Sequence, residues 1–262
     1  PRFSYTTPTQ EGPTLMSLSN EAEWEGAALE VLGELSWTNL TGQQISPSAQ
    51  GEAHTETGLP IYQHLREKHD ALEIPGLLRA SIAKLNHEFN LTSEQINQVA
   101  RDITTAKSTD AQAENQDAHR YLTQGYKNLQ VTRADGSTYY PTIRVISRNP
   151  DENTWLAVQQ VTLKNSENER RFDIVLYCNG LPIGVIELKR SGDRAADLKG
   201  AHNQIALYTK QFPAAFRFNV LTIISDGVTA RYGTPFTPYI HMAVWNVDED
   251  GKPVDLLHAS DD

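Results

Sequence analysis

The chain has 262 residues, 39% of them hydrophobic, which is enough to bury one sizeable core with a smaller subdomain attached. No apolar run reaches the roughly 20 residues needed to cross a bilayer, and the N-terminus lacks the basic-then-apolar order of a secretory signal, so we expect a cytoplasmic protein with no membrane partner. The formal net charge of -10 predicts weak binding to nucleic acid by this chain alone, because phosphate contacts normally need a basic surface.

The first half of the chain has the pattern of helices. Residues 1–18 are rich in Pro, Thr, Ser and Gln without periodicity, and we interpret them as a loosely ordered lead-in. A cap at Ser19 or Asn20, acids in the next turn and an apolar stripe behind them predict a helix that ends near Leu35. Residues 38–58 have the composition of a loop. Further helices, which together form a helical insertion at about residues 60–130, are expected over residues 63–72, 75–85, 92–105 and 115–126.

From about residue 139 the hydrophobic period changes to that of strands. One long helix, residues 195–211, interrupts them, and this order predicts an α/β fold with a mixed sheet in one domain over residues 19–247. The single cysteine, Cys178, lies in an apolar run, which excludes an intrachain disulfide and a metal-thiolate cluster and indicates a small buried side chain. The expected strands cover residues 142–147, 155–164, 172–178, 181–189, 218–225, 228–232 and 241–247.

Three residues in the strand region have the chemistry that phosphodiester hydrolysis needs, namely Asp173, Glu187 and Lys189. Carboxylates hold a hard cation such as Mg²⁺, and a lysine activates water or stabilises developing negative charge. Glu187 and Lys189 are one residue apart, so on a strand both project from the same face. Leu188 between them faces the core and offers its backbone carbonyl as a further metal ligand. A solvated strand face is the alternative, but these charges end an almost wholly apolar strand.

The hairpin that joins these strands makes a geometric prediction. The Asn-Gly pair at 179–180 is a strong signal for a two-residue turn. A strict two-residue turn puts Asp173 on the opposite face from Glu187, whereas a register shift of one residue puts them opposite each other. The candidate site therefore requires a three-residue loop or a bulge, and Pro182, which cannot donate to a ladder, marks the expected place.

Charge is unevenly distributed along the chain. Acidic residues are frequent in the first third and in residues 248–262. Basic residues are frequent near the candidate site, which we interpret as a locally basic working face, with ordinary solvated charges as the alternative. These basic residues are Lys164, Arg170, Arg171, Lys189, Arg190, Arg194, Lys199, Lys210, Arg217 and Arg231.

Two motifs, Phe-Asp-Ile-Val-Leu-Tyr to Val-Ile-Glu-Leu-Lys over residues 172–189 and Gln-Ile-Ala-Leu-Tyr at residues 204–208, resemble those of a known family, the restriction (R) subunit of type I restriction-modification enzymes. The first comprises residues 172–177 (Phe-Asp-Ile-Val-Leu-Tyr), 179–182 (Asn-Gly-Leu-Pro) and 185–189 (Val-Ile-Glu-Leu-Lys), and it is similar to the nuclease motif of that subunit. The second, residues 204–208 (Gln-Ile-Ala-Leu-Tyr), matches the Gln-x-x-x-Tyr motif that follows it. Softer matches extend the resemblance over about residues 20–247.

The resemblance implies a PD-(D/E)xK, restriction-endonuclease-like core, which is a Mg²⁺-dependent endonuclease domain that cleaves double-stranded DNA. Asp173 and Glu187 would bind the metal, and Lys189 would orient or deprotonate the attacking water and stabilise the phosphate. Gln204 and Tyr208 would position the DNA strand or the site, with a hydrogen-bonded packing pair as the alternative. The modification and specificity subunits of the complex would be partners.

Glu25 is a weaker candidate. It lies on the first expected helix, twelve residues before Trp37, where several nucleases of this fold place a glutamate near the metal. Glu21 and Glu23 are rivals for that position. An ordinary acid at a helix N-terminus, which the helix dipole favours, is the simpler alternative.

In that family two helicase-type ATPase motor domains follow the nuclease, but this chain has no Gly-x-x-x-x-Gly-Lys-Ser/Thr phosphate loop. We therefore interpret it as an N-terminal fragment, with residues 248–262 as an acidic linker toward the motor and ATP as a cofactor of the full-length parent only. Two other functions remain open at this point. One is a stand-alone PD-(D/E)xK repair or junction-cleaving nuclease, and the other is a non-catalytic docking module whose triad is vestigial.

Overall fold

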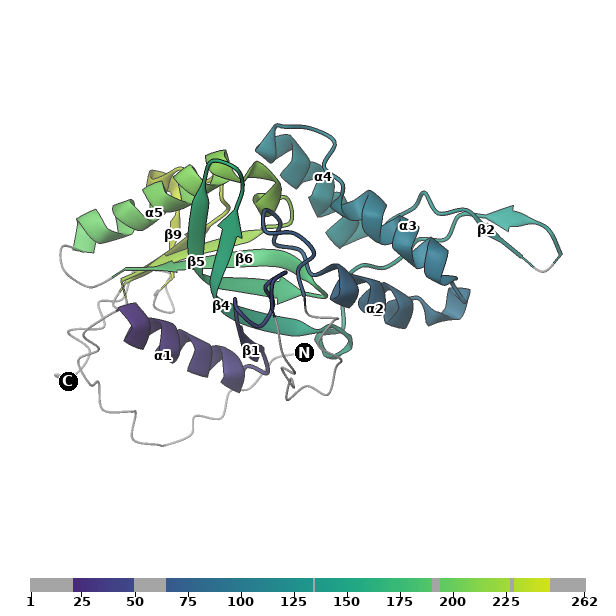
Figure 1. Cartoon of the computed structure of the whole chain (residues 1–262), viewed down its shortest axis with the longest axis horizontal. Helices are drawn as coiled ribbons and strands as arrows, with labels where there is room; N and C mark the ends of the chain where they lie inside the picture. Colours follow the sequence, from purple (N-terminus) through teal and green to yellow (C-terminus); the bar gives the residue numbers. More distant parts are fainter. Residues whose placement is uncertain (1–20, 50–64, 134, 190–193, 227–228, 246–262) are drawn as a thin grey trace.

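The protein is described from a computed structural model that covers residues 21–49, 65–133, 135–189, 194–226 and 229–245 (Figure 1). The expected lead-in 1–18, the helix cap at Ser19 or Asn20 and the expected linker 248–262 lie outside these residues. Within the described ranges, no helix is both long and apolar enough to span a lipid bilayer.

Seven strands form one sheet in the order β1-β4-β5-β6-β7-β8-β9. β1 pairs with β4 and β6 with β7 in parallel, and the other neighbours are antiparallel. The predicted α/β fold with a mixed sheet is therefore confirmed. The strands are β1 (Thr38–Thr41), β4 (Trp155–Lys164), β5 (Glu169–Cys178), β6 (Leu181–Leu188), β7 (Leu221–Ser225), β8 (Ala230–Gly233) and β9 (Ala243–Val244).

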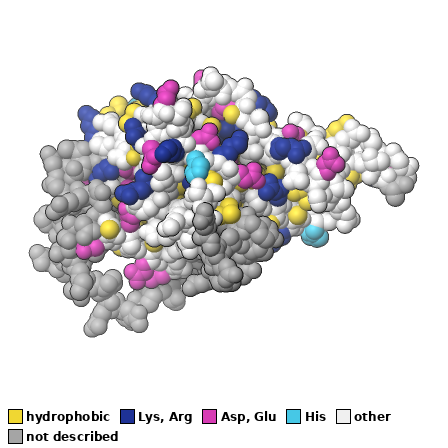
Figure 2. All heavy atoms as spheres, viewed as in Figure 1, with side chains coloured by type: hydrophobic (Ala, Val, Ile, Leu, Met, Phe, Trp, Pro, Cys, Tyr) yellow, Lys and Arg dark blue, Asp and Glu magenta, His cyan; other side chains and the backbone are white. Residues whose placement is uncertain are grey.

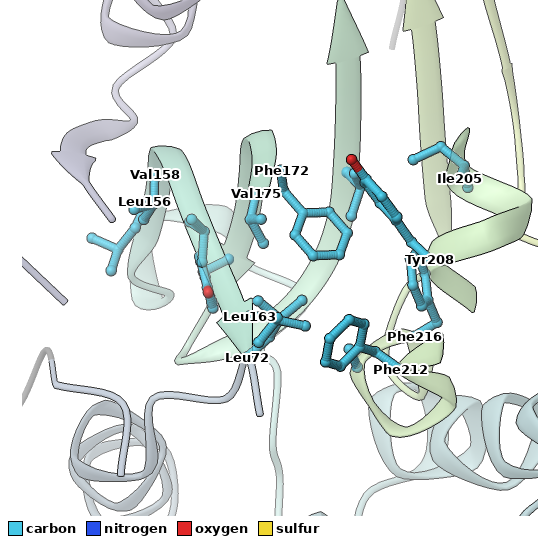
Figure 3. Close-up of a cluster of buried hydrophobic side chains, with 14 of the residues drawn as sticks. Leu72, Leu156, Val158, Leu163, Phe172, Val175, Ile205, Tyr208, Phe212 and Phe216 are labelled. Atoms are coloured by element: carbon cyan, nitrogen blue, oxygen red, sulfur yellow. The ribbon is translucent and has the colours of Figure 1, made fainter. Parts of the chain in front are cut away.

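Two helices cover the sheet from opposite sides (Figure 1). α1 (Glu21–Glu34) covers one face, and α5 (Arg194–Gln211) with the 3-10 helix η4 (Pro213–Phe216) covers the other. On the α5 side the rings of Phe172 and Tyr208 pack against each other, as Figure 3 shows. Their centroids are 4.9 Å apart. The core on the α1 side contains Leu29, Ala157, Ile174, Leu176, Ile186 and Leu188.

A helical insertion between β1 and β4 lies at one end of the sheet (Figure 1). It has its own hydrophobic core, which includes Leu181 of β6 and Phe218 in the turn before β7. A buried ion pair, with 2.7 Å between Arg217 Nε and Glu114 Oε2, fastens it to the segment after α5. Asn115 strengthens this link because its side-chain amide donates to three backbone carbonyls of that segment. The elements of the insertion are α2 (Pro75–Leu85), η2 (His87–Phe89), α3 (Ser93–Thr104), α4 (Ala111–Gln124), β2 (Val131–Thr132), β3 (Thr138–Tyr139) and η3 (Pro150–Glu152).

The helix starts follow local capping chemistry. α3 begins with the predicted capping box, in which Thr92 accepts from the Gln95 amide and the Gln95 side chain accepts from the Thr92 amide. α4 was expected from residue 115 but begins at Ala111, because the Asp110 carboxylate accepts from two amides of the first turn. The expected helices over residues 75–85 and 195–211 form as predicted.

Two expectations for the N-terminal third are wrong. Residues 65–72 belong to an expected helix but are irregular, because Arg66 donates to the carbonyls of Ala71 and Thr162 and so ties the segment to β4. Residues 63 and 64 of that helix lie outside the described part of the chain. The expected loop 38–58 contains β1, and its residues 50–58 lie outside the described part of the chain. The polar sequence of β1 gives a weak strand pattern, since Leu40 is its one buried residue.

The expected strand over residues 142–147 is also wrong. This segment makes a single bridge, between Ile143 and Tyr126. The side-chain amide of Asn86 takes the place of a neighbouring strand at the next residue, donating to the Arg144 carbonyl and accepting from the Arg144 amide. A tertiary contact by a side chain therefore satisfies backbone groups that the sequence pattern assigns to a sheet.

The last strands are shorter than expected. β7 begins at Leu221, three residues after the predicted start, because residues 213–216 form η4 and a turn follows. β8 begins at Ala230, and position 228, the predicted start, lies outside the described residues. The 3-10 helix η5 (Tyr239–His241) occupies the predicted start of the final strand, which leaves β9 with two residues.

Candidate active site

The β5–β6 hairpin turns on Asn179 and Gly180, which both have a left-handed φ, of 54° and 84°. The buried Asn179 side chain accepts from the Thr154 amide and donates to the Val145 carbonyl. A Cβ at Gly180 would lie 2.5 Å from the carbonyl oxygen of Ile74. The turn therefore requires the Asn-Gly pair, and it has two residues as the sequence predicts.

The register shift that the candidate site needs is present. Tyr177 pairs with Pro182, but the next pair is Leu176 with Gly184, which leaves Ile183 as an extra residue on β6. This is a β-bulge directly after the proline, where an irregularity is tolerated because proline cannot donate to the ladder. The predicted bulge near Pro182 is confirmed.

The bulge brings Asp173 and Glu187 to the same face. The last regular pair is Ile174 with Ile186, and one step further along this register Asp173 lies opposite Glu187. There the ladder stops, and the Leu188 amide donates to Asp173 Oδ2 at 2.7 Å. Asp173 is thereby held against the strand that carries Glu187.

Glu187 is a buried carboxylate with a lysine beside it. Its side chain is 0% exposed, and its Oε1 lies 2.8 Å from Lys189 Nζ. Such a partner is needed, because leaving one member of a buried ion pair alone costs about 3 to 5 kcal/mol. The Lys189 side chain is 22% exposed, so it links the buried carboxylate to the surface. The Lys189 amide donates to the Ser225 carbonyl at 2.8 Å, which keeps this residue beside β7.

The candidate catalytic residues face α5. Val175 and Val185 belong to the core on the α5 side, and Asp173 and Glu187 lie two residues away on the same strands. On β6, side chains two apart share a face, so Glu187 faces this helix as Val185 does. On β5 the alternation is broken, because Phe172 and Val175 both belong to this core, but Asp173 lines a hollow together with Gln204 and Tyr208 of α5. Leu188 packs in the core on the α1 side, as its position in the strand predicts.

A hollow of about 540 Å³ lies at this place. β4 and β5 continue to pair beyond the last pair of β5 with β6, so their hairpin forms one wall and α5 forms another (Figure 1). The hollow therefore brings together Asp173, Lys189, Gln204 and Tyr208, four of the five main candidate site residues, from three separate segments of the chain. The fifth, Glu187, is buried and is not among the residues that line it. The hollow is lined by Thr162, Glu169, Arg170, Arg171, Asp173, Lys189, Gln204 and Tyr208.

Gln204 and Tyr208 lie one turn apart on α5 and are joined by a hydrogen bond from the Gln204 amide to the Tyr208 hydroxyl. The Tyr208 ring packs on Phe172, and its hydroxyl lies 3.4 Å from the Arg171 carbonyl. Burial, followed by the negative charge of Glu187, raises the pKa of the Tyr208 phenol. Tyr208 is therefore part of the core through its ring and part of the hollow through its hydroxyl.

Glu25 lies against Gln160, a residue that sequence reasoning missed. Both carboxylate oxygens of Glu25 are 2.5 Å from Gln160 Nε2, and Glu25 is buried. Gln160 interrupts the β4–β5 ladder opposite Asp173 and has a left-handed φ of 55°. That conformation costs a non-glycine residue about 1 to 2 kcal/mol, so a surrounding constraint must hold it. No sequence pattern marks a glutamine for this role.

Two further residues test the charge and cysteine predictions. Arg217 was expected on a basic working face, but its side chain is 1% exposed and paired with Glu114 inside the insertion, so that expectation is wrong for this residue. Arg190 and the side chain of Arg194 lie outside the described residues. Cys178 is buried as predicted, and burial raises the pKa of its thiol to about 12.

The sequence is similar to known proteins over most of its length. Residues 18–239 match the family described as "Type I restriction enzyme R protein N terminus". The type I restriction enzyme HindI endonuclease subunit of Haemophilus influenzae is 27% identical over 244 residues, which cover 90% of this chain and 21% of that protein. The putative type I restriction enzyme MjaIXP endonuclease subunit of Methanocaldococcus jannaschii is 23% identical over 241 residues, covering 89% and 21%.

A shorter match has higher identity. The type I restriction enzyme SauCOLORF180P endonuclease subunit of Staphylococcus aureus is 37% identical over 135 residues, which cover 50% of this chain and 14% of that protein. The chain spans about a fifth of the length of the two relatives that it matches over most of its own length.

Proposed function

This chain belongs to the family of type I restriction enzyme R protein N termini, and we propose that it is the DNA-cleaving domain of such an enzyme, with a PD-(D/E)xK core. The observation that carries the proposal is the bulged β5–β6 hairpin. It puts Asp173 opposite Glu187, and Glu187 has Lys189 Nζ at 2.8 Å from its Oε1. Two carboxylates and an ammonium group beside a hollow are the groups that phosphodiester hydrolysis uses.

The donor set fits Mg²⁺. This ion is usually held by one or two carboxylates and keeps water and substrate phosphate oxygens as its other ligands. Within the described residues, no three His, Cys, Asp or Glu side chains form a group that could hold a metal ion. Protein side chains would therefore supply only some of the ligands of the ion. Asp173 and Glu187 would hold the ion, with the backbone carbonyl of Leu188 as a further ligand. Glu25, bound to Gln160, stays a prediction for another metal-proximal carboxylate.

The residues of this chain divide the work of the reaction. When bound, Mg²⁺ polarises the phosphate and makes the attacking water more acidic. Lys189 reaches from the buried Glu187 to the hollow. As an ammonium group it would orient the water and stabilise the charge that develops on the phosphate, and as a neutral amine it would deprotonate the water. Gln204 and Tyr208, on the α5 wall, would position the DNA strand or the site.

The activity of the whole enzyme extends beyond this chain. We propose that it cleaves double-stranded DNA in the cytoplasm, together with modification and specificity subunits. The chain spans about a fifth of its relatives, so ATP binding and movement along DNA would belong to other parts of the full-length parent. The net charge of -10 supports this division, because strong DNA binding would then come from elsewhere in the complex.

The proposal is tested by Glu187→Gln in the full-length parent, assembled with its partner subunits. DNA cleavage in Mg²⁺ should be lost while ATP hydrolysis is kept, because the change removes a proposed ligand of the nuclease metal and this chain has no phosphate loop for ATP. Glu167→Gln is the matched control, since Glu167 is an exposed glutamate at the end of the β4–β5 hairpin. Cleavage at the normal rate by Glu187→Gln would exclude the nuclease assignment of this site.

The same experiment addresses the alternative that this chain is a docking module with a vestigial triad. In that case Glu187→Gln should leave cleavage unchanged, or should weaken assembly of the subunits instead. Measuring subunit assembly by size-exclusion chromatography on the same variant separates the two. A stand-alone repair or junction nuclease is disfavoured by the family match over residues 18–239.

A further inference from the structure

A second hollow, of about 500 Å³, lies beside the first. Thr162, Glu169 and Arg171 line both, so the β4–β5 hairpin is a ridge between them. The remaining lining of the second hollow comes from the end of β1, the segment that contains Arg66 and His69, and the outer part of β4. These residues are Thr41, Gly42, Gln43, Ser46, Arg66, His69, Gln160 and Lys164.

The charge of this hollow is opposite to that of the chain. Glu169 is the one acid among the residues that line it, whereas the chain as a whole carries a net charge of -10. Glu169 is 3.0 Å from Lys164, and the two side chains are 58% and 64% exposed. Ion pairs with this exposure contribute at most about 1 kcal/mol, so Lys164 can turn to another anion at little cost. Figure 2 shows Lys and Arg side chains, with some acids between them, over α5 and the β4–β5 hairpin.

Arg171 is the residue best placed to bind an anion here. Its side chain is exposed on the ridge and lines both hollows. Among the described residues its guanidinium group has no hydrogen-bond or ion-pair partner, while its carbonyl oxygen lies 3.4 Å from the Tyr208 hydroxyl. Arg171 and Asp173 both line the first hollow and are two residues apart on β5, which is roughly 7 Å along the strand.

Arg66 has a different role in the same hollow. It is 2% exposed, and its two terminal nitrogens donate to the carbonyls of Ala71 and Thr162. These bonds hold the segment that contains Arg66 against β4. Contacts with an anion in the hollow would therefore be made by the exposed Lys164 and Arg171. Hydroxyl and amide side chains complete the lining, and such groups, with Lys and Arg, make most contacts to the sugar-phosphate backbone of DNA.

We infer that the second hollow binds the backbone phosphates of a DNA strand next to the phosphate that is cut, and that Lys164 and Arg171 are its cationic contacts. The inference rests on the proposed function for the placement of the cut phosphate near Asp173. It gives the DNA strand a path over the ridge, from the second hollow into the first. Such contacts fix the position of the strand and carry no sequence information.

The test is DNA binding by the 262-residue chain without cleavage. Fluorescence anisotropy with a labelled duplex in EDTA gives the association constant at several salt concentrations. Lys164→Gln and Arg171→Gln should each reduce the slope of log K against log salt by about 0.9, the value for one lost phosphate contact. The affinity gap between wild type and variant should therefore widen about eightfold for each tenfold dilution of salt.

Two exposed cations on the helical insertion serve as matched controls, Lys127→Gln and Arg101→Gln. Their slopes should equal that of the wild type. Slopes for Lys164→Gln and Arg171→Gln that match these controls would overturn the inference. If Arg171→Gln also lowers the melting temperature, the slope of Lys164→Gln tests the inference instead. The Lys164 side chain is 64% exposed, so its substitution should leave the fold intact.

The outcome is independent of the cleavage test. If Glu187→Gln abolishes cleavage while Lys164→Gln and Arg171→Gln keep the normal slope, the nuclease assignment stands and the second hollow is not a DNA site. If Glu187→Gln cleaves normally while the two cation variants lose slope, the nuclease assignment fails and the DNA-binding hollow stands.

Discussion

The backbone amide of Leu188 donates a hydrogen bond to the Asp173 carboxylate, with 2.7 Å between N and Oδ2, at the point where β5 and β6 stop pairing. The bond ties the position of one candidate metal ligand to the strand that carries the other. Asp173 therefore has two separable roles: its charge would serve the metal, and its oxygen satisfies a backbone donor.

These roles predict different effects for two substitutions of Asp173. Asp173→Asn removes the charge but keeps an oxygen that can accept from Leu188, so the chain should melt near the wild-type temperature. Asp173→Ala leaves the amide without its acceptor and should lower the free energy of unfolding by about 1 to 3 kcal/mol. Both should abolish cleavage by the parent enzyme. Thermal and urea unfolding measure the stability of each variant. Equal stability of Asp173→Asn and Asp173→Ala would contradict the role of Asp173 as acceptor for the Leu188 amide.

Gln204 and Tyr208 predict a graded loss. Tyr208→Phe keeps the ring against Phe172 and removes the hydroxyl at the hollow. If the hydroxyl positions a charged group, cleavage should fall roughly ten- to a hundredfold, since such a bond is worth about 1.5 to 3 kcal/mol. Gln204→Ala should act in the same direction, with ATP hydrolysis of the parent unchanged. Normal cleavage by both variants, with a lower melting temperature for Gln204→Ala, would show that the pair serves packing alone.

Substitution of Asn179 should lower the stability of the fold, because Asn179 holds the turn and is not a candidate catalytic residue. Its buried side chain bonds to Thr154 and Val145, and its backbone has a left-handed φ. Asn179→Ala loses these bonds and puts alanine in an unfavourable conformation, so the free energy of unfolding should fall by about 3 kcal/mol or more. Asn128→Ala, an exposed position in the same chain, is the control and should change it little. An unfolding curve for Asn179→Ala that overlays the wild type would refute this account of the turn.

The buried ion pair of Arg217 and Glu114 predicts non-additive behaviour. Glu114→Gln leaves the buried guanidinium without its counter-charge and should lower the free energy of unfolding by about 3 to 5 kcal/mol. Adding Arg217→Met to that variant should recover part of the loss, because the uncompensated charge is then gone. Urea unfolding of the two single variants and the double variant measures this coupling. Additive losses would mean that the pair does not fasten the insertion to the core.

The hairpin was predictable from sequence because each of its constraints is local. Asn-Gly fixes a two-residue turn, proline permits an irregularity beside it, and the requirement that Asp173 and Glu187 share a face demands a shift of one residue. The bulge at Ile183 meets all three conditions. Local chemistry also predicted the capping box at Thr92.

The parts that sequence reasoning missed depend on distant contacts. Gln160 donates to Glu25 of α1, 135 positions away in the chain, and its backbone has a left-handed φ. Asn86 takes the place of a strand partner for Arg144 across 58 positions. Arg217 has the sequence context of a surface cation, yet it is buried against Glu114. Hydrophobic periodicity and local propensity carry no information about such pairs.

The most direct test of the central claim is the rate of DNA cleavage by the parent enzyme that carries Asp173→Asn, Glu187→Gln or Lys189→Gln, measured beside the double variant Asp173→Asn/Glu187→Gln. When residues act as one catalytic unit, the effects of their substitutions on the rate are not additive. Replacing a second member therefore lowers the rate little once the first has been replaced. We expect all four enzymes to hydrolyse ATP normally and to show the same residual cleavage, at the limit of detection. Substantial cleavage by any single variant, or a further large loss in the double variant, would contradict a single site formed by these three residues.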